Sequence, residues 1–150
     1  MSESLNLNYT ITNEDFTRAG EASGDVKSKL KMMGVPPEVV RKVSIAMYEG
    51  EINMVIHAGG GTIDVIITTD DITMILKDNG PGIADIDLAM QAGYSTASEN
   101  VRALGFGAGM GLPNMKKYSD EMTIDTQLGI GTTVTMKVYF KPRTDAQPSA

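Results

Sequence analysis

Three separated groups of residues have types and spacings that could bind and process a nucleotide. Glu49, Asn53 and His57 lie four positions apart, so on a helix they share one polar face. If that face turns toward a cleft, the Asn53 oxygen is a suitable ligand for Mg²⁺, and the Glu49 carboxylate could orient or deprotonate a hydroxyl. A solvated helix edge is the alternative for this spacing taken alone.

The second group begins with Asp78, which ends an apolar segment and precedes Gly80, Gly82 and Ile83. A carboxylate at the end of a strand can accept a hydrogen bond from an exocyclic amine such as that of adenine. The glycines would let the backbone pass close to a flat ring. A plain tight turn is the alternative, because Asp, Asn, Gly and Pro all favour turns.

The third group is a run of small residues just before a short predicted helix. Its members are Gly105, Gly107, Ala108, Gly109, Met110 and Gly111, followed by Leu112. Backbone N–H groups near the start of a helix bind phosphate well. No strand leads into the run, which argues against a Rossmann fingerprint, and no Gly-Lys-Ser/Thr follows, which argues against a P-loop. A flexible hinge is the alternative.

Two smaller features complete the set. Thr132 follows the predicted turn Gly129-Ile130-Gly131, and its hydroxyl could reach a base directly or through water. The alternative is an ordinary hairpin turn. Arg102 lies in a long segment without periodicity, where it could reach a γ-phosphate or a carboxylate of a partner. A solvated arginine is the alternative there.

Periodicity and turn residues predict the elements that must position these groups. The predicted helices cover 13–33, 36–58, 85–91 and 112–118, and the predicted strands cover 5–11, 62–69, 72–77, 121–127 and 132–140. Asn13 is the expected N-cap of the first helix and Gly34 its stop. The order lacks the strict strand–helix alternation of a Rossmann domain. It predicts an α+β two-layer sandwich, with helices on one face of a mainly antiparallel mixed sheet.

Composition narrows the classes of function. The 150 residues suit a single domain over 1–140, and 141–150 is expected to be a disordered tail. A net charge of −6 argues against nucleic acid as a partner. The chain has no cysteine and one histidine, which excludes disulfides and disfavours a zinc site. With no signal sequence and no apolar run near ~20 residues, no membrane association and a cytoplasmic location are expected.

Together the motifs resemble the ATP-binding domain shared by type II topoisomerases, histidine kinases and mismatch-repair ATPases, the GHKL superfamily. The resemblance covers residues 36 to 140. The matching residues, in the order of the superfamily's four boxes, are Glu49, Asn53 and His57; Asp78, Gly80, Gly82 and Ile83; Gly105 to Gly111; and Gly129, Gly131 and Thr132. The fold implied is the Bergerat-type ATP-binding fold.

Within the superfamily, the chain is most similar to bacterial anti-sigma-factor serine kinases and stress-cascade switch kinases. The similarity rests on 46–58, on 80–96 and on 107–113. Two departures are a longer stretch over 97–104 and the sequence Gly50-Glu51-Ile52, where these relatives usually carry a small residue and Thr.

The resemblance implies that ATP binds with adenine on Asp78, with its phosphates under a lid over 93–111 and with Mg²⁺ on Asn53. Glu49 would be the catalytic base. The implied cofactor contacts are Asn53, His57, Asp78, Gly80, Gly82, Ile83, Ser95, Thr96, Arg102, Gly105, Gly107, Ala108, Gly109, Met110, Gly111, Leu112 and Thr132.

The implied phosphate acceptor is a Ser or Thr of a STAS-domain anti-anti-sigma or scaffold protein. A sigma factor, a phosphatase or a second copy of the chain stay open as further partners. Three alternatives remain. A nucleotide-dependent protein could sequester a sigma factor without catalysis. A histidine kinase fragment is disfavoured because no helical dimerisation module precedes the domain. A simple ATPase would need an ordered water and usually a transducer domain.

Overall fold

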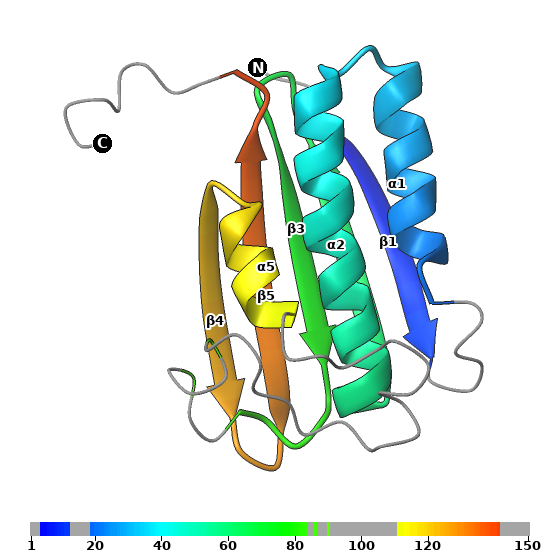
Figure 1. Cartoon of the computed structure of the whole chain (residues 1–150). Coiled ribbons are helices and arrows are strands. Elements are labelled where there is room, and N and C mark those ends of the chain that lie inside the picture. The colour runs from blue at the N-terminus through cyan, green and yellow to red at the C-terminus, as the bar shows by residue number, and fades with distance from the viewer. Residues whose placement is uncertain (1–3, 13–18, 84–85, 87–89, 91–110, 142–150) are drawn as a thin grey trace, which may run out of the picture.

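The computed structural model describes residues 4–12, 19–83, 86, 90 and 111–141. Its strands are β1 (Leu5–Thr12), β2 (Gly60–Ile67), β3 (Asp71–Asp78), β4 (Glu121–Gln127) and β5 (Gly131–Tyr139), and its helices are α1 (Glu21–Met32), α2 (Pro37–Ala58) and α5 (Gly111–Lys117). The five strands form one sheet in the order β1-β2-β3-β5-β4, and every neighbouring pair is antiparallel. The three helices cover one face of it (Figure 1). The predicted α+β two-layer sandwich is confirmed.

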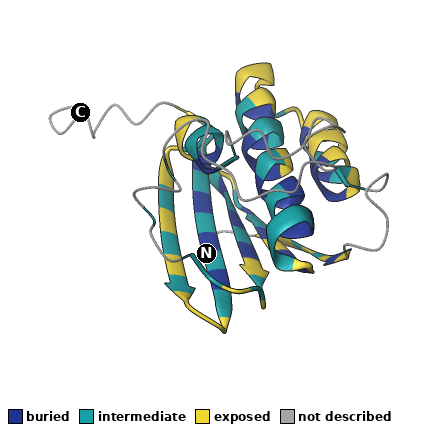
Figure 2. Ribbon diagram, turned by 60° about the horizontal axis from the view of Figure 1, so that its bottom comes forward, coloured by how far each residue is buried: buried dark blue, intermediate teal, exposed yellow. Residues whose placement is uncertain are grey.

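The core lies between the helices and the sheet, where the buried residues gather (Figure 2). Along β3 and β5 every second residue is buried, as expected for strands with one covered face. Helix α2 approaches the sheet closely at Gly50, where an added Cβ would lie 2.3 Å from Cδ2 of Leu76. A side chain at position 50 would therefore require the buried Leu76 side chain, or α2 itself, to shift.

The start of α1 differs from the prediction. Gly20 has φ 103, a left-handed conformation that cannot continue a helix, and α1 begins at Glu21. Asn13, the expected N-cap, lies outside the described residues. The predicted stop is confirmed, because α1 ends just before Gly34, which has φ 78.

A buried carboxylate of α2 caps the start of α1. Glu51 is 2% exposed, and its Oε2 accepts hydrogen bonds from the backbone N–H groups of Gly20 at 2.8 Å and Ala22 at 3.2 Å. Its Oε1 accepts from Ser23 N–H at 3.0 Å. The first N–H groups of a helix have no partners within the helix and carry partial positive charge. Glu51 therefore joins the two helices by satisfying them.

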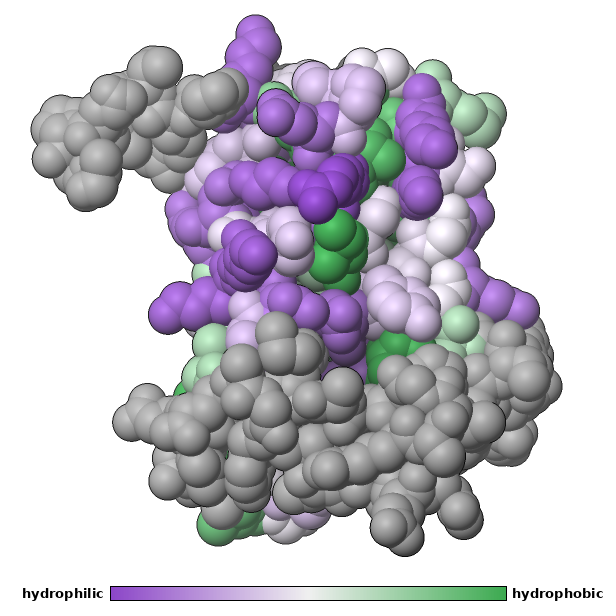
Figure 3. All heavy atoms as spheres, viewed as in Figure 1, coloured by the Kyte–Doolittle hydropathy of each residue, from purple (hydrophilic) through white to green (hydrophobic). Residues whose placement is uncertain are grey.

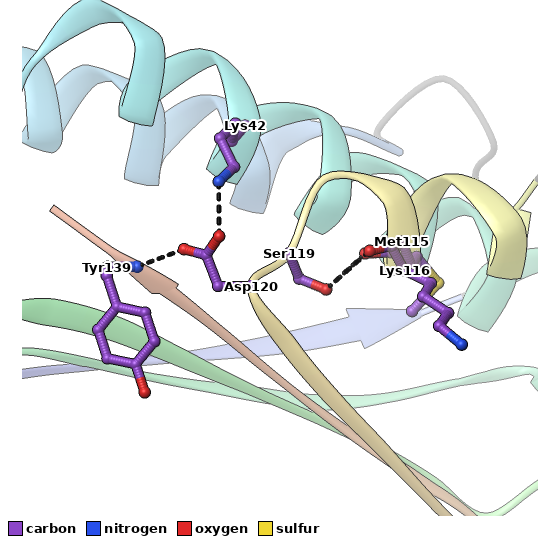
Figure 4. A network of polar contacts seen from close by, with 6 residues as sticks. All are labelled: Lys42, Met115, Lys116, Ser119, Asp120 and Tyr139. Carbon is purple, nitrogen blue, oxygen red and sulfur yellow. Dashed lines mark hydrogen bonds and ion pairs between the residues drawn. The ribbon is translucent and has the colours of Figure 1, made fainter. Parts of the chain in front are cut away.

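Polar contacts join α2, β5 and the connection between α5 and β4 (Figure 4). Lys42 Nζ lies 2.8 Å from Oδ1 of Asp120, whose Oδ2 accepts a hydrogen bond from the backbone N–H of Tyr139 at 2.7 Å. An ion pair this exposed contributes at most about 1 kcal/mol. By register, Tyr139 lies opposite Asp71, so this network is at the end of β3 remote from Asp78.

Of the short helix predicted over 85–91, the structure describes Ile86 and Met90. The N–H of Met90 donates to the carbonyl of Ile86 at 2.9 Å, the spacing of an α-helical hydrogen bond. On the side that carries the helices, hydrophilic side chains dominate the surface of the described residues, with small hydrophobic areas between them (Figure 3). No helix in the described part is long and apolar enough to cross a membrane.

Candidate functional site

The C-terminal half of α2 carries the first group of predicted site residues. Glu49, Asn53 and His57 lie on successive turns, and each is partly buried rather than fully exposed. This burial argues against the solvated-edge alternative. Figure 1 shows the end of α2 that carries them at the same edge of the molecule as the end of β3.

Glu49 has one hydrogen-bond donor among the described residues. Nδ2 of Asn114, on α5, donates to Oε2 of Glu49 at 3.2 Å. Burial raises the pKa of the Glu49 carboxyl above its usual range, and the Asn114 hydrogen bond opposes that shift in part. A carboxylate with a raised pKa is a stronger base than an ordinary exposed glutamate. Asn114 was not predicted as a site residue, and its only signal in the sequence was a polar residue in the helix after the glycine run.

The carboxylate of Asp78 is held by backbone donors at the end of β3. Its Oδ1 accepts hydrogen bonds from Gly80 N–H at 2.9 Å and from Thr132 N–H at 3.2 Å. No described residue donates to Oδ2. The two backbone donors fix the orientation of the carboxylate, and Oδ2 is then available to a donor on a ligand.

Two glycines allow close backbone contacts around Asp78. Gly131 has φ 151, and a Cβ there would lie 2.1 Å from the carbonyl oxygen of Asp78. A Cβ on Gly80 would lie 2.8 Å from Cα of Ala58, at the end of α2. The segment after Asp78 that contains Gly80, Gly82 and Ile83, the first glycine motif, therefore packs against α2 directly. The turn before β5 packs against the end of β3.

Thr132 and Thr126 link the first glycine motif to the β4–β5 hairpin. Thr132 is 6% exposed, and its Oγ1 lies 2.8 Å from Oγ1 of Thr126. Thr126 Oγ1 also accepts a hydrogen bond from the backbone N–H of Ile83 at 2.8 Å. Gly82, at φ 82, lies against the carbonyl of Gln127, where an added Cβ would be 2.6 Å from the oxygen. The sequence did not single out Thr126, and a base contact by Thr132 stays a prediction.

The third group is described only at its end. Gly111 starts α5, and a Cβ there would lie 3.7 Å from Oδ1 of Asn53, so the end of the glycine run reaches the predicted metal ligand. Leu112 is buried in the core. The predicted contacts outside the described residues are Ser95, Thr96, Arg102, Gly105, Gly107, Ala108, Gly109 and Met110.

The described residues thus combine three chemical functions at one edge of the fold. Asp78 offers a fixed carboxylate oxygen to a hydrogen-bond donor, Asn53 offers a neutral oxygen, and Glu49 offers a carboxylate of raised pKa. Asp78 comes from β3, and Glu49 and Asn53 come from α2. Helix α5 contacts the two residues on α2, through Asn114 and Gly111. Such a set can hold a planar base at one end and act on a hydroxyl at the other.

Comparison with known proteins agrees with this geometry. The family model for histidine kinase-, DNA gyrase B- and HSP90-like ATPases matches residues 40–142. The anti-sigma F factor of Caldanaerobacter subterraneus subsp. tengcongensis is 35% identical over 108 residues, which are 69% of this chain and 72% of that protein.

Two further relatives extend the comparison. The serine/threonine-protein kinase RsbT of Bacillus subtilis is 32% identical over 97 residues, covering 62% of this chain and 67% of RsbT. The anti-sigma F factor of Bacillus licheniformis is 25% identical over 142 residues, covering 89% of this chain and 90% of that protein. The chain therefore belongs to the family of histidine kinase-, DNA gyrase B- and HSP90-like ATPases, and within it is similar to anti-sigma F factors and to the kinase RsbT.

Proposed function

We propose that this chain binds ATP with Mg²⁺ and transfers the γ-phosphate to a Ser or Thr hydroxyl of a STAS-domain partner protein. The observation that carries the proposal is Glu49. It is a partly buried carboxylate of raised pKa, one helical turn from Asn53, and a described residue donates to only one of its oxygens. A site that only bound a nucleotide would have no need of such a base.

The described residues fit ATP with Mg²⁺. Asp78 Oδ2 is available to the amino group of adenine, because the backbone donors of Gly80 and Thr132 both bind Oδ1. Asn53 Oδ1 faces the start of α5 and suits Mg²⁺, which takes few protein ligands and shares its shell with phosphates and water. When bound there, Mg²⁺ would neutralise charge that develops on the phosphates.

In the proposed reaction, Glu49 accepts the proton of the partner's hydroxyl. The hydroxyl oxygen forms a bond to the γ-phosphorus, the bond from that phosphorus to the bridging oxygen breaks, and ADP leaves with the electron pair. Glu49 is left protonated and later releases the proton to water. Because most of the catalysis of phosphoryl transfer comes from positioning and charge stabilisation, the base contributes only part of the rate.

The adenine contact gives a direct test of the pocket. Asp78→Asn replaces one carboxylate oxygen by an NH₂ group, which donates and cannot accept. The one remaining oxygen cannot accept both from the backbone donors and from the amino group of adenine. We expect ATP affinity to fall by roughly 1–3 kcal/mol, the usual cost of a mispaired buried polar group. Isothermal titration calorimetry measures it, with Asp125→Asn on the exposed side of β4 as the matched control. Equal affinity of the two variants would contradict the assignment of Asp78.

A second function has its own support. Two of the three relatives described above are named anti-sigma F factors, and that name refers to action against a sigma factor. The alternative is therefore a nucleotide-dependent protein that sequesters a sigma factor without catalysis. The pocket around Asp78 would serve either function, and Glu49 favours the kinase.

A transfer assay separates the two functions. The purified chain is incubated with ATP labelled at the γ-phosphate, Mg²⁺ and each STAS-domain protein and sigma factor encoded by the same genome. Label on a Ser or Thr of a STAS protein supports the kinase. A stable complex with a sigma factor and no label on any protein supports sequestration and contradicts the kinase.

A further inference from the structure

Asn114 makes a contact that joins two elements distant in sequence. It lies 65 positions after Glu49, in the first turns of α5, and its side-chain amide donates to Oε2 of Glu49 at 3.2 Å. Both side chains are partly buried, so the hydrogen bond is shielded in part from water. A hydrogen bond to a charged group in such surroundings is stronger than one between neutral groups.

The packing of α5 on α2 fixes this contact. Met115, beside Asn114, is 1% exposed and lies against Gly50, where an added Cβ would be 3.1 Å from its Cε. One turn earlier, Gly111 faces Oδ1 of Asn53. Helix α5 thus meets both predicted chemical groups of α2, and its first residue is also the last of the glycine run.

We propose that Asn114 is a positioning residue that holds Oε2 of Glu49 and leaves Oε1 as the oxygen that accepts the proton of the acceptor hydroxyl. The proposal rests on the proposed function only in giving Glu49 the role of base. No described residue donates to Oε1. The amide carries no charge of its own, so it orients the carboxylate without neutralising it. A Lys or Arg side chain in its place would neutralise the carboxylate.

The hydrogen bond from Asn114 also connects Glu49 to Gly111, the last residue of the glycine run, because Asn114 and Gly111 lie on the same helix. A shift of α5 along α2 would lengthen the hydrogen bond from Asn114 and release Glu49. The charged form of Glu49 would then lose the one described donor that favours it. The contact that orients Glu49 therefore depends on the packing of α5 on α2.

Three variants of Asn114 test the proposal. Asn114→Leu removes the donor at similar volume, Asn114→Asp places a second carboxylate beside Glu49, and Asn114→Gln keeps an amide donor. Lys116→Leu, at an exposed position of the same helix, is the matched control. Carbon-13 NMR follows the titration of the Glu49 carboxyl, assigned by comparison with Glu49→Gln, and therefore does not depend on activity. Phosphate transfer is measured across the same pH range, and ATP affinity by calorimetry.

We expect the Leu and Asp variants to raise the pH at which Glu49 titrates and to move the acid limb of the transfer rate the same way. At pH values below the wild-type midpoint, their rate should fall on the order of tenfold, the usual worth of a hydrogen bond to a charged group. The Gln variant should restore much of the rate, and ATP affinity should change by less than about threefold in all variants, because Asn114 does not touch Asp78.

An unmoved Glu49 titration in folded Asn114→Leu or Asn114→Asp would overturn the proposal, even if the wild type transfers phosphate. If Asn114→Leu does not fold, the comparison of Asn114→Asp with Asn114→Gln decides. The proposal requires the Glu49 carboxyl to titrate at a higher pH in Asn114→Asp than in Asn114→Gln. A shifted titration in a protein that transfers no phosphate would support the contact from Asn114 and contradict the kinase function instead.

Discussion

Glu49→Gln should lower the rate of phosphate transfer by about 10²–10⁴-fold, the range that a general base usually contributes. Glutamine has nearly the shape of glutamate and can still accept the hydrogen bond from Asn114, but it cannot take a proton. ATP affinity should change by less than about threefold, because the proposed contact with adenine is made by Asp78, on another element. Rates come from the labelled transfer assay and affinities from calorimetry.

The pH dependence gives the same assignment an independent check. Burial raises the pKa of Glu49 above its usual range, and Glu49 must be deprotonated to act as base. The transfer rate should therefore fall as the pH is lowered through this raised pKa, at a higher pH than for an exposed glutamate. Glu38→Gln, at an exposed position near the start of the same helix, should leave rate and profile unchanged. Wild-type transfer by Glu49→Gln would remove Glu49 from the mechanism.

Glu51→Ala should lower the free energy of unfolding by about 3–5 kcal/mol, because each buried donor left without an acceptor costs roughly 1–3 kcal/mol. The substitution leaves the backbone N–H groups of Gly20, Ala22 and Ser23 without their acceptor at the start of α1. It also empties space between α1 and α2. Urea denaturation followed by circular dichroism measures the loss.

Two matched variants separate the causes of that loss. Glu51→Gln keeps one acceptor oxygen and the volume but not the charge, so it should be intermediate. Glu38→Ala, exposed in the first turn of the same helix, should lower stability by about 1 kcal/mol or less. A loss for Glu51→Ala no greater than that of Glu38→Ala would mean that the three hydrogen bonds do not stabilise the fold.

The types and order of the described elements could be predicted because their signals are local. Alternation in β3 and β5 and the glycine after α2 are properties of short windows. The start of α1 could not be predicted in this way. Its cap comes from Glu51, 28 to 31 positions away, and a charged residue between Gly50 and Ile52 indicated only a departure from relatives. The signal that could have shown this cap was a carboxylate placed between two uncharged residues, Gly50 and Ile52, in the middle of a helix.

The residues of the candidate site likewise fall into those that the sequence predicted and those that it did not. The spacing of Glu49 and Asn53 predicted a shared helix face, and Asp78 was expected at a strand end, because both follow from one element at a time. Asn114 was missed because its partner is set by how α5 packs on α2, which has no local signature in the chain. Thr126 lies opposite Thr132 in the β4–β5 pair, and the predicted turn between these two strands was a signal that could have shown it.

The hydrogen bond from Thr132 to Asp78 joins residues 54 positions apart, and β5 pairs with nearly the whole of β3. During synthesis, β3 leaves the ribosome well before β5, so a nascent chain has Asp78 but lacks the strand that orients it. Closing so large a loop carries an entropic cost that only the completed strand pair offsets. We therefore expect the proposed nucleotide contact of Asp78 to form only after β5 has been made and paired. Because a ligand stabilises only the state that binds it, ATP would act selectively on finished molecules.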